Sequence, residues 1–598
     1  MITESREFRR NNLDKSASPY LLQHVANPVW WQEWNEDVIN YVRESGKPIF
    51  VSVGYATCHW CHVMAAGAFS DAETAYFLNE HFISIKIDRE QRPDIDQMMM
   101  DFIQRQNGSG GWPLNVFLTS SLKPVYALTF APAKPGSTTF SFLDIADKVL
   151  EFIRINSEKV PDFVPTENKS GSVSEHSVIK MLSEYYDNEN GGFGHSQKFP
   201  PHSTLLFLLY QMSIEDSPSL NTIVTKTLDS MVMRGLNDHL QGGIFRYCVD
   251  TEWTIPHFEK MLYDQAMALW CYSLAFRITG REHYKKMSLK ILRCLDETFL
   301  RDGLYITAHD ADTDHVEGLT YLWSYDELEE ALGESELKRL ADAYYISPSG
   351  NFEKKNHLIR RNSDDVSDIE EKLLSIRRSR KQPGEDGKIL SGLNALAATA
   401  LIQMSRCLDM LHVEERAAAL VKNIRNVFWK DGRLSHSLFA NKIQEQSFLF
   451  DTASLLHVVT MLSETGDEWV PFMDELAANL KMFNSGGRWI ESDSPDFMTV
   501  FASWFDHPIP SGAAMAENAL TRYSVLKGED IQSSEYHQPF SSDFYNINSM
   551  IRNGLFHIYT SREKLGWSNL PVNSIQARGI HEQDCFMGVC RPLYQNAT

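Results

Sequence analysis

The feature that most constrains this fold is the stretch "GYATCHWCHVM", residues 54–64, in which two residues separate Cys58 from Cys61. The preceding "KPIFVSV" is a short apolar run typical of a strand, and the following sequence predicts a helix over residues 62–82. The pair therefore stands where a strand turns into a helix. Because N–H groups and the dipole at a helix N-terminus favour thiolate, this placement indicates redox chemistry at Cys58.

Other uses of this motif compete with the redox interpretation. C-x-x-C-H is also a haem attachment pattern, but that use requires export, and "MITESREFRRNNLDKS" has no apolar signal segment. Zinc held by Cys58, Cys61, His59 and His62 alone is strained, because adjacent helical residues point about 100° apart. Two buried structural thiols remain an alternative, since the motif is short. We expect no metal and no cofactor.

The elements around the pair predict an α/β thioredoxin-like domain. "FISIKID" reads as a second strand, "PDIDQMMMDFIQRQ" as a helix, and "PLNVFLTS" with "KPVYALTF" as a hairpin. Trp112 and Pro113 occupy the place of the proline, usually cis, that faces the cysteines in such folds. After a last helix, "PDFVPTENKSGSVSEH" reads as a linker. We expect the first domain at 1–165, a linker at 166–176 and a second domain at 177–598.

Beyond the linker, long apolar helices replace the strands. A Gly-containing loop recurs six times between them, near Gly191, Gly242, Asp302, Gly350, Asp431 and Gly486. Each interval is long enough for about two helices and their connections. Six such hairpins predict a closed double ring of helices. An open helical solenoid is the alternative.

Composition narrows the range of partners. The chain has 57 Lys and Arg against 79 Asp and Glu, a formal charge of -22, which disfavours nucleic acid and anionic lipid. The longest apolar run, around "STLLFLLYQM", is about half the length that spans a bilayer. We therefore expect a soluble, cytoplasmic protein with neither nucleic acid nor a membrane as partner.

Two loops of the helical part carry residues suited to sugar chemistry. "DTEWTIPHFEKMLYDQA" places His257 and Glu259 in the first turn of a helix, and "TAHDADTDHVEG" offers His309, Asp310, Asp312 and Glu317. Glycosidic cleavage needs paired carboxylates, and epimerisation needs a base and an acid on opposite faces. The predicted catalytic residues of this part are therefore His257, Glu259, Asp310 and Asp312. Solvated helix caps are the alternative interpretation.

Further residues are predicted to bind substrate. Around the cysteines, a protonated His59 would favour the thiolate, and Trp60 would cover the pair. In the helical part, the rings of Trp253, Phe258, Trp323 and Trp489 could stack on sugars, although tryptophans are often core residues. The complete set of predicted binding residues is His59, Trp60, Trp112, Pro113, Lys198, Trp253, Glu317 and Trp323.

Motifs along nearly the whole chain resemble the spermatogenesis-associated thioredoxin-domain family. They are "SPYLLQHVANPVWWQEW", "KPIFVSVGYATCHWCHVM", "FISIKIDREQRPDID", "GSGGWPLNVFLT", "GGFGHSQKFP", "WTIPHFEKMLYDQA", "DADTDHVEG" and "CFMGVCRP". The resemblance implies a thioredoxin-like domain followed by an all-α (α/α)6 barrel similar to N-acylglucosamine 2-epimerase and cellobiose epimerase, the six-hairpin glycosidase type. This chain departs from the family pattern at several barrel loops. Phe245 replaces a common His, and Val316 interrupts an acidic run.

These observations leave two classes of function open. The first is an enzyme that exchanges thiols and disulfides at Cys58 and Cys61 and carries a saccharide-binding or saccharide-converting cleft. The second is a non-catalytic, redox-responsive scaffold whose barrel only binds. The expected partners are a small saccharide and a protein disulfide or thiol reductant. We expect Cys58 to be the exposed nucleophile and Cys61 the shielded resolving cysteine. Cys585 and Cys590 are expected to be reduced thiols.

Overall fold

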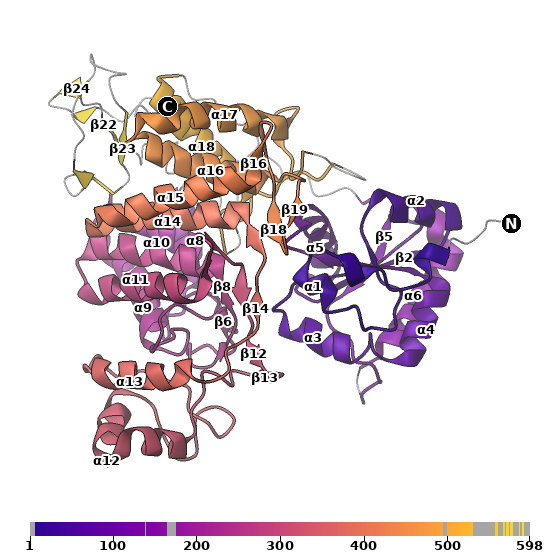
Figure 1. Cartoon of the computed structure of the whole chain (residues 1–598), viewed down its shortest axis with the longest axis horizontal. Helices are drawn as coiled ribbons and strands as arrows, with labels where there is room; N and C mark the ends of the chain where they lie inside the picture. The colour runs from indigo at the N-terminus through magenta and orange to yellow at the C-terminus, as the bar shows by residue number, and fades with distance from the viewer. Residues whose placement is uncertain are drawn as a thin grey trace.

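The chain forms an α/β thioredoxin-like domain and an all-α (α/α)6 barrel, which lie side by side (Figure 1). The structure is a computed structural model. It describes residues 6–137, 139–163, 175–493, 499–506 and 508–529, and then the short stretches 557–559, 566–567, 570–572, 574–577, 585–586 and 589–590. Most of the predicted linker, 166–176, lies outside the described residues, and helix α7 begins at Glu175.

A five-stranded sheet forms the centre of the first domain. Its order is β1-β3-β2-β4-β5, with β2 parallel to β3 and antiparallel to β4. All side chains of β2 and β3 are buried, as expected for strands covered on both faces. The predicted hairpin is present as β4 and β5. The strands are β1 (Gln32–Glu33), β2 (Ile49–Gly54), β3 (Ile83–Asp88), β4 (Leu114–Leu118) and β5 (Pro124–Leu128).

The helices of this domain differ from the prediction in one respect. The predicted helix over 62–82 is wrong as one element, because it is divided into two. The chain leaves the helical conformation at Gly67, and Asp71 caps a new helix by accepting a hydrogen bond from the backbone N–H of Thr74. The helices are α1 (Pro19–Leu22), α2 (Glu36–Ser45), α3 (His59–Ala66), α4 (Ala72–His81), α5 (Pro93–Asn107) and α6 (Phe142–Asn156).

The barrel has an inner layer and an outer layer of helices. In the described part of the chain, five inner helices contact one another in series and are apolar on nearly all sides. The inner helices are α8 (His202–Met212), α10 (Leu262–Thr279), α14 (Ser391–Leu408), α16 (Leu449–Ser463) and α18 (Gly512–Lys527). The outer helices are α7 (Glu175–Tyr185), α9 (Pro218–Met233), α11 (Glu282–Cys294), α15 (Leu411–Phe428) and α17 (Val470–Leu480).

The recurring loops mark most, but not all, of the helix pairs. Five of the six lie where an outer helix is followed by the rim of the barrel. The loop at Gly350 instead belongs to an excursion that carries α12 (Tyr325–Ala343) and α13 (Ser367–Arg378) below the ring (Figure 1). Its Gly350 has a φ of 73°, and an added Cβ would collide with the backbone at Lys355, so the glycine serves a tight turn.

The inner helices present their N-termini to the thioredoxin-like domain. Short rim strands precede these termini and lie at the junction of the domains (Figure 1). Helix N-termini carry partial positive charge, so carboxylates are stabilised at this end of the barrel. The rim strands used below are β6 (Tyr247–Cys248), β7 (Pro256–His257), β8 (Lys260–Met261), β11 (Ala308–His309), β12 (Asp312–Thr313), β13 (Val316–Glu317) and β14 (Glu385–Asp386).

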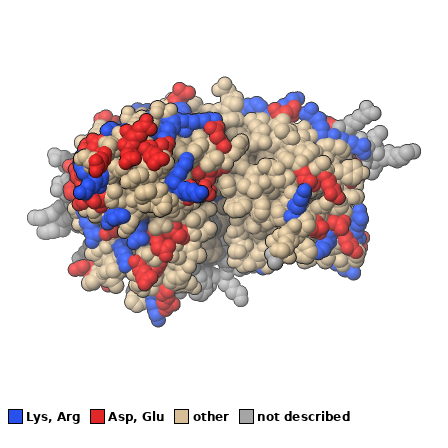
Figure 2. All heavy atoms as spheres, turned by 90° about the horizontal axis from the view of Figure 1, so that it is seen from below, with Lys and Arg blue, Asp and Glu red and all other residues tan. Residues whose placement is uncertain are grey.

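The surface carries both signs of charge. Figure 2 shows acidic and basic side chains interspersed on both lobes of the molecule, rather than a broad field of one sign. Among the described residues, no helix combines the length and apolar character needed to cross a bilayer.

Candidate functional site

Cys58 and Cys61 form a disulfide at the start of α3. Cys58 is the N-cap residue of this helix, and its Sγ accepts a hydrogen bond from the backbone N–H of Cys61 at 3.3 Å. β2 ends four residues before Cys58, so a buried strand delivers the pair to the helix N-terminus. This is the strand-to-helix placement that the sequence predicts. The same N–H is positioned to stabilise negative charge on Cys58 after reduction.

The exposure of the pair differs from the prediction. Cys58 is 3% exposed and Cys61 is 2% exposed, so the expectation of an exposed Cys58 is wrong. The barrel rim contacts the residues on either side of the pair, Thr57, His59 and His62. Trp60 is half exposed, and its ring contacts those of His59 and Phe130.

The predicted cis proline is present, since the Trp112–Pro113 peptide bond is cis. Trp112 lies under the guanidinium of Arg89, which is 3.8 Å from the ring centroid. The indole N–H of Trp112 donates to Asp96 at 2.7 Å. Burial raises the pKa of Asp96 to about 6, although Arg89 opposes the shift. Trp112 is therefore held by a charged network beside the pair.

Both histidines of the motif contact acids of the barrel. Nδ1 of His59 is 3.4 Å from Asp312, and Nε2 of His62 is 3.4 Å from Asp310. The hydrogen bond with Asp312 raises the pKa of His59, so its imidazole holds a proton more firmly than a free histidine. A charged His59 beside Cys58 favours the thiolate, as the sequence suggests. The structure thus brings the predicted residues of the two domains into one site.

Glu259 lies in the same site and is fully buried. It accepts hydrogen bonds from the hydroxyl of Thr57, the residue before Cys58, and from the hydroxyl of Tyr55 at 3.5 Å. His257 lies 3.9 Å from Glu259 and is 2.6 Å from Glu317 on its other side. The buried Glu259 is thereby linked, through His257, to the partly exposed Glu317.

The predicted helical position of His257 and Glu259 is wrong. His257 lies in β7, which pairs with β6, and Glu259 stands between β7 and β8, whereas α10 begins at Leu262. The rim strands take the backbone hydrogen bonds that a helical turn would otherwise make. The extended conformation carries both side chains toward the thioredoxin-like domain.

Replacement of Glu259 by glutamine is expected to stabilise the protein at about pH 8 and to have little effect at about pH 4. Burial raises the pKa of Glu259 from 4.5 to about 7, so between these values only the folded chain keeps the proton. Stability therefore falls by about 3 kcal/mol as the pH rises through this window. Glutamine removes that loss. Urea unfolding at pH 8 and at pH 4 measures the free energy of unfolding of Glu259→Gln and of the wild type. The replacement of the exposed Glu385 by glutamine is the control. A stability difference independent of pH would contradict the expectation.

The predicted sugar-stacking tryptophans do not line this site. Trp253 is fully buried against Gly192 in the barrel core, and Trp323 is 1% exposed beneath Arg380. Both are core residues, so the prediction that they stack on a ligand is wrong in this structure. Lys198 is also buried, and its ammonium binds Asp187 at 2.9 Å.

A second set of polar groups lies at the N-terminal ends of α8 and α10. His202, Asp264 and Arg246 are buried, with ion-pair distances of 3.6 Å from His202 to Asp264 and 3.5 Å from Arg246 to Asp264. Neither ring nitrogen of His202 and neither carboxylate oxygen of Asp264 has a hydrogen-bond partner within the described residues. Buried polar atoms are normally satisfied, so these groups suit a polar occupant.

A buried ion cluster joins the domains beside the site. Lys388, fully buried after β14, lies 2.8 Å from Asp88, 2.9 Å from Glu90 and 3.1 Å from Asp386. Asp88 and Glu90 come from the end of β3 and the loop after it. Burial raises the pKa of Asp386, with Lys388 opposing the shift. Asp88 lies 300 positions from Lys388 in the sequence, so the sequence does not indicate that these two residues meet.

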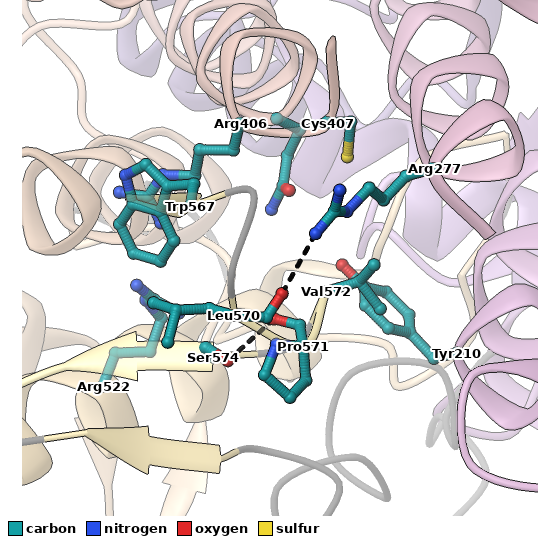
Figure 3. A pocket seen from close by; sticks show the side chains of 11 residues that line it. Tyr210, Arg277, Arg406, Cys407, Arg522, Trp567, Leu570, Pro571, Val572 and Ser574 are labelled. Atoms are coloured by element: carbon teal, nitrogen blue, oxygen red, sulfur yellow. Dashed lines mark hydrogen bonds between the residues drawn. The ribbon is translucent and has the colours of Figure 1, made fainter. Parts of the chain in front are cut away.

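A separate, small pocket of about 30 Å³ lies at the other end of the barrel, near the C-termini of the inner helices (Figure 3). Arg406, stacked on Trp567, and Arg522 both pair with Glu464 there. None of the predicted site residues lines this pocket.

Two further predictions concern cysteines and metal. Cys585 and Cys590 face each other in the backbone register of β24 (Cys585–Phe586) and β25 (Val589–Cys590), but their side chains lie outside the described residues. Cys248, Cys271, Cys294 and Cys407 are buried free thiols. In the part of the chain that the structure describes, no group of three or more His, Cys, Asp or Glu has the arrangement of a metal site.

Comparison with known proteins places these observations in a family. The family model Thioredox_DsbH, described as a protein of unknown function, DUF255, matches residues 10–166. An uncharacterized protein of Caenorhabditis elegans, B0495.5, is 31% identical, and the match covers 87% of this chain and 81% of that protein. Spermatogenesis-associated protein 20 of Rattus norvegicus is 31% identical over 87% of this chain and 76% of its own length.

Solved structures resemble the two domains at low identity. Cellobiose 2-epimerase from Spirochaeta thermophila is 13% identical, covering 67% of this chain and 86% of its own, with a TM-score of 0.41. A structure titled DsbH Oxidoreductase is 19% identical, covering 21% of this chain and 86% of its own, with a TM-score of 0.17. Neither likeness bears on activity. The extended sequence matches show that the chain belongs to the spermatogenesis-associated protein 20 family.

Proposed function

We propose that this protein is a thiol-disulfide oxidoreductase whose redox pair, Cys58 and Cys61, works in a site completed by the barrel. The observation that carries the proposal is the hydrogen bond from the N–H of Cys61 to Sγ of Cys58 at the N-terminus of α3. It supports a stabilised Cys58 thiolate, and His59, held by Asp312, adds positive charge. The proposed partner is a protein dithiol or disulfide, and the proposed compartment is the cytoplasm.

A redox titration tests this function. The purified oxidised protein is equilibrated in dithiol buffers of graded potential, and the Cys58–Cys61 bond is followed by mass spectrometry after thiol trapping. We expect reversible two-electron reduction with a midpoint above about -300 mV, since structural disulfides fall below that value. A lower midpoint, or unfolding on reduction, would identify the pair as structural.

Saccharide binding in the barrel is a second candidate, favoured by the polar atoms of His202 and Asp264, which have no hydrogen-bond partner within the described residues. A neutral polyol supplies both donors and acceptors, as this mixed set requires. Glu259 is fully buried where the barrel packs against the thioredoxin-like domain. The saccharide would therefore occupy the barrel interior rather than a site on Glu259. The absence of any thermal stabilisation by free hexoses would remove this candidate and leave a barrel that serves the redox pair.

A further inference from the structure

Two side chains meet over Gly54, the last residue of β2. A Cβ added to Gly54 would lie 2.7 Å from Sγ of Cys61 and still closer to the hydroxyl oxygen of Tyr20. Both atoms therefore lie within 2.7 Å of one point, and the distance between them is at most twice that value, about 5.4 Å. Glycine at position 54 is what allows this approach. Tyr20 belongs to α1, so it reaches the pair from the N-terminal segment.

The Tyr20 hydroxyl is buried without a hydrogen-bond partner. Tyr20 is 0% exposed, and its oxygen has no partner within the described residues. An unsatisfied buried hydroxyl costs about 1–3 kcal/mol, so phenylalanine would be the more stable residue if only packing mattered. The orphan donor faces the sulfur that becomes a thiolate on reduction.

The surroundings keep this hydroxyl protonated. Burial, and then the carboxylate of Asp88, raise the pKa of Tyr20 well above 10. The other charged or titratable groups beside it are Lys86, 5.2 Å from the ring centroid, and His24, whose ring is 4.9 Å away. From the barrel, Lys388 binds Asp88 at 2.8 Å. Tyr20 is thus a neutral donor throughout the physiological range.

We propose that the Tyr20 hydroxyl donates a hydrogen bond to the Cys61 thiolate that forms when the Cys58–Cys61 disulfide is reduced. The proposal rests on the proposed thiol-disulfide function. A thiolate of a partner dithiol attacks Sγ of Cys58, the disulfide bond breaks, and its electron pair leaves with Cys61. The second partner thiolate then attacks the mixed disulfide and releases Cys58. The partner ends as a disulfide, Cys58 and Cys61 leave the exchange as thiolates, and the two protons that the partner dithiol gave up remain in solvent.

The test compares Tyr20 with Tyr20→Phe in a Cys58→Ser background, where Cys61 cannot form its disulfide. The ultraviolet absorbance of the Cys61 thiolate is followed against pH. Because a hydrogen bond to a charged group is lost, the Cys61 pKa is expected to rise by about one unit in Tyr20→Phe. Tyr272→Phe, which removes another buried hydroxyl in the barrel, is the matched control and should leave the titration unchanged.

Two outcomes would overturn the proposal. The first is that Cys61 titrates identically in the protein with Tyr20 and in the Tyr20→Phe variant, with folding verified by circular dichroism. The hydroxyl then donates no hydrogen bond to the Cys61 thiolate. If Tyr20→Phe does not fold, Gly54→Ala replaces it, since the added Cβ displaces both atoms; an unshifted Cys61 pKa there also refutes the proposal. Because these titrations need no partner, they succeed or fail independently of the redox titration that tests the proposed function.

Discussion

Replacing Cys58 by serine is expected to abolish the reaction of this protein with dithiols and small disulfides, whereas replacing Cys61 by serine stops the reaction at a mixed disulfide. Cys58 is the helix N-cap residue, and its sulfur accepts the N–H of Cys61. Cys61 lies inside the first turn and faces Gly54. The attacking role therefore falls to Cys58 and the resolving role to Cys61.

Mass spectrometry after exposure of the reduced proteins to a disulfide peptide measures this outcome. Wild type should exchange to completion, Cys61→Ser should retain one peptide per chain, and Cys58→Ser should retain none. Cys271→Ser is the matched control, because Cys271 is a fully buried free thiol whose pKa burial raises far above the usual range. A stable adduct on Cys58→Ser would assign the nucleophile to another cysteine.

Replacing Lys388 by alanine is expected to cost about 3–5 kcal/mol of folding stability, the largest loss that we predict for a single side chain. Three carboxylates, Asp88, Glu90 and Asp386, surround this ammonium at 2.8, 2.9 and 3.1 Å, and all are nearly inaccessible to water. Without the lysine, uncompensated negative charge stays buried between the domains. Breaking such a cluster on one side costs far more than the intact cluster contributes.

Denaturant unfolding of Lys388→Ala measures this loss. Lys442→Ala is the control, because Lys442 also bridges the domains by donating to the carbonyl of Lys15, but its contact is exposed. We expect the control to change stability by less than about 1 kcal/mol. If the two variants differ by no more than this amount, the buried cluster does not hold the domains together.

Some sequence predictions were wrong because composition does not distinguish a binding aromatic from a core aromatic. Trp253 and Trp323 stand in loops rich in polar residues, yet the fold turns both inward. A buried tryptophan and one that stacks on a ligand have the same chemistry, and only neighbours brought together by folding separate them. The same applies to Cys58, whose burial appears only in the folded structure.

The site also contains contacts that no local motif indicates. Thr57 and Tyr55 hold Glu259 across about 200 positions of sequence, and His59 reaches Asp312 across 253. Tyr20 and Gly54 lie on different elements. Only the folded structure shows that the Tyr20 hydroxyl and Sγ of Cys61 approach each other over Gly54.

The sequence alone determined the elements whose physics is local. An apolar run of six residues forms β2, the cysteines follow at the helix N-terminus, and the strand pair after Trp112–Pro113 closes the sheet. These follow from hydrophobic periodicity, turn residues and caps, which act over a few residues. Only folding brings Glu259, Asp310 and Asp312 of the barrel rim against Thr57, His62 and His59, the residues that flank the redox pair. Such contacts depend on how two folded surfaces pack together. They join residues that lie far apart in the sequence, so no short stretch of the chain predicts them.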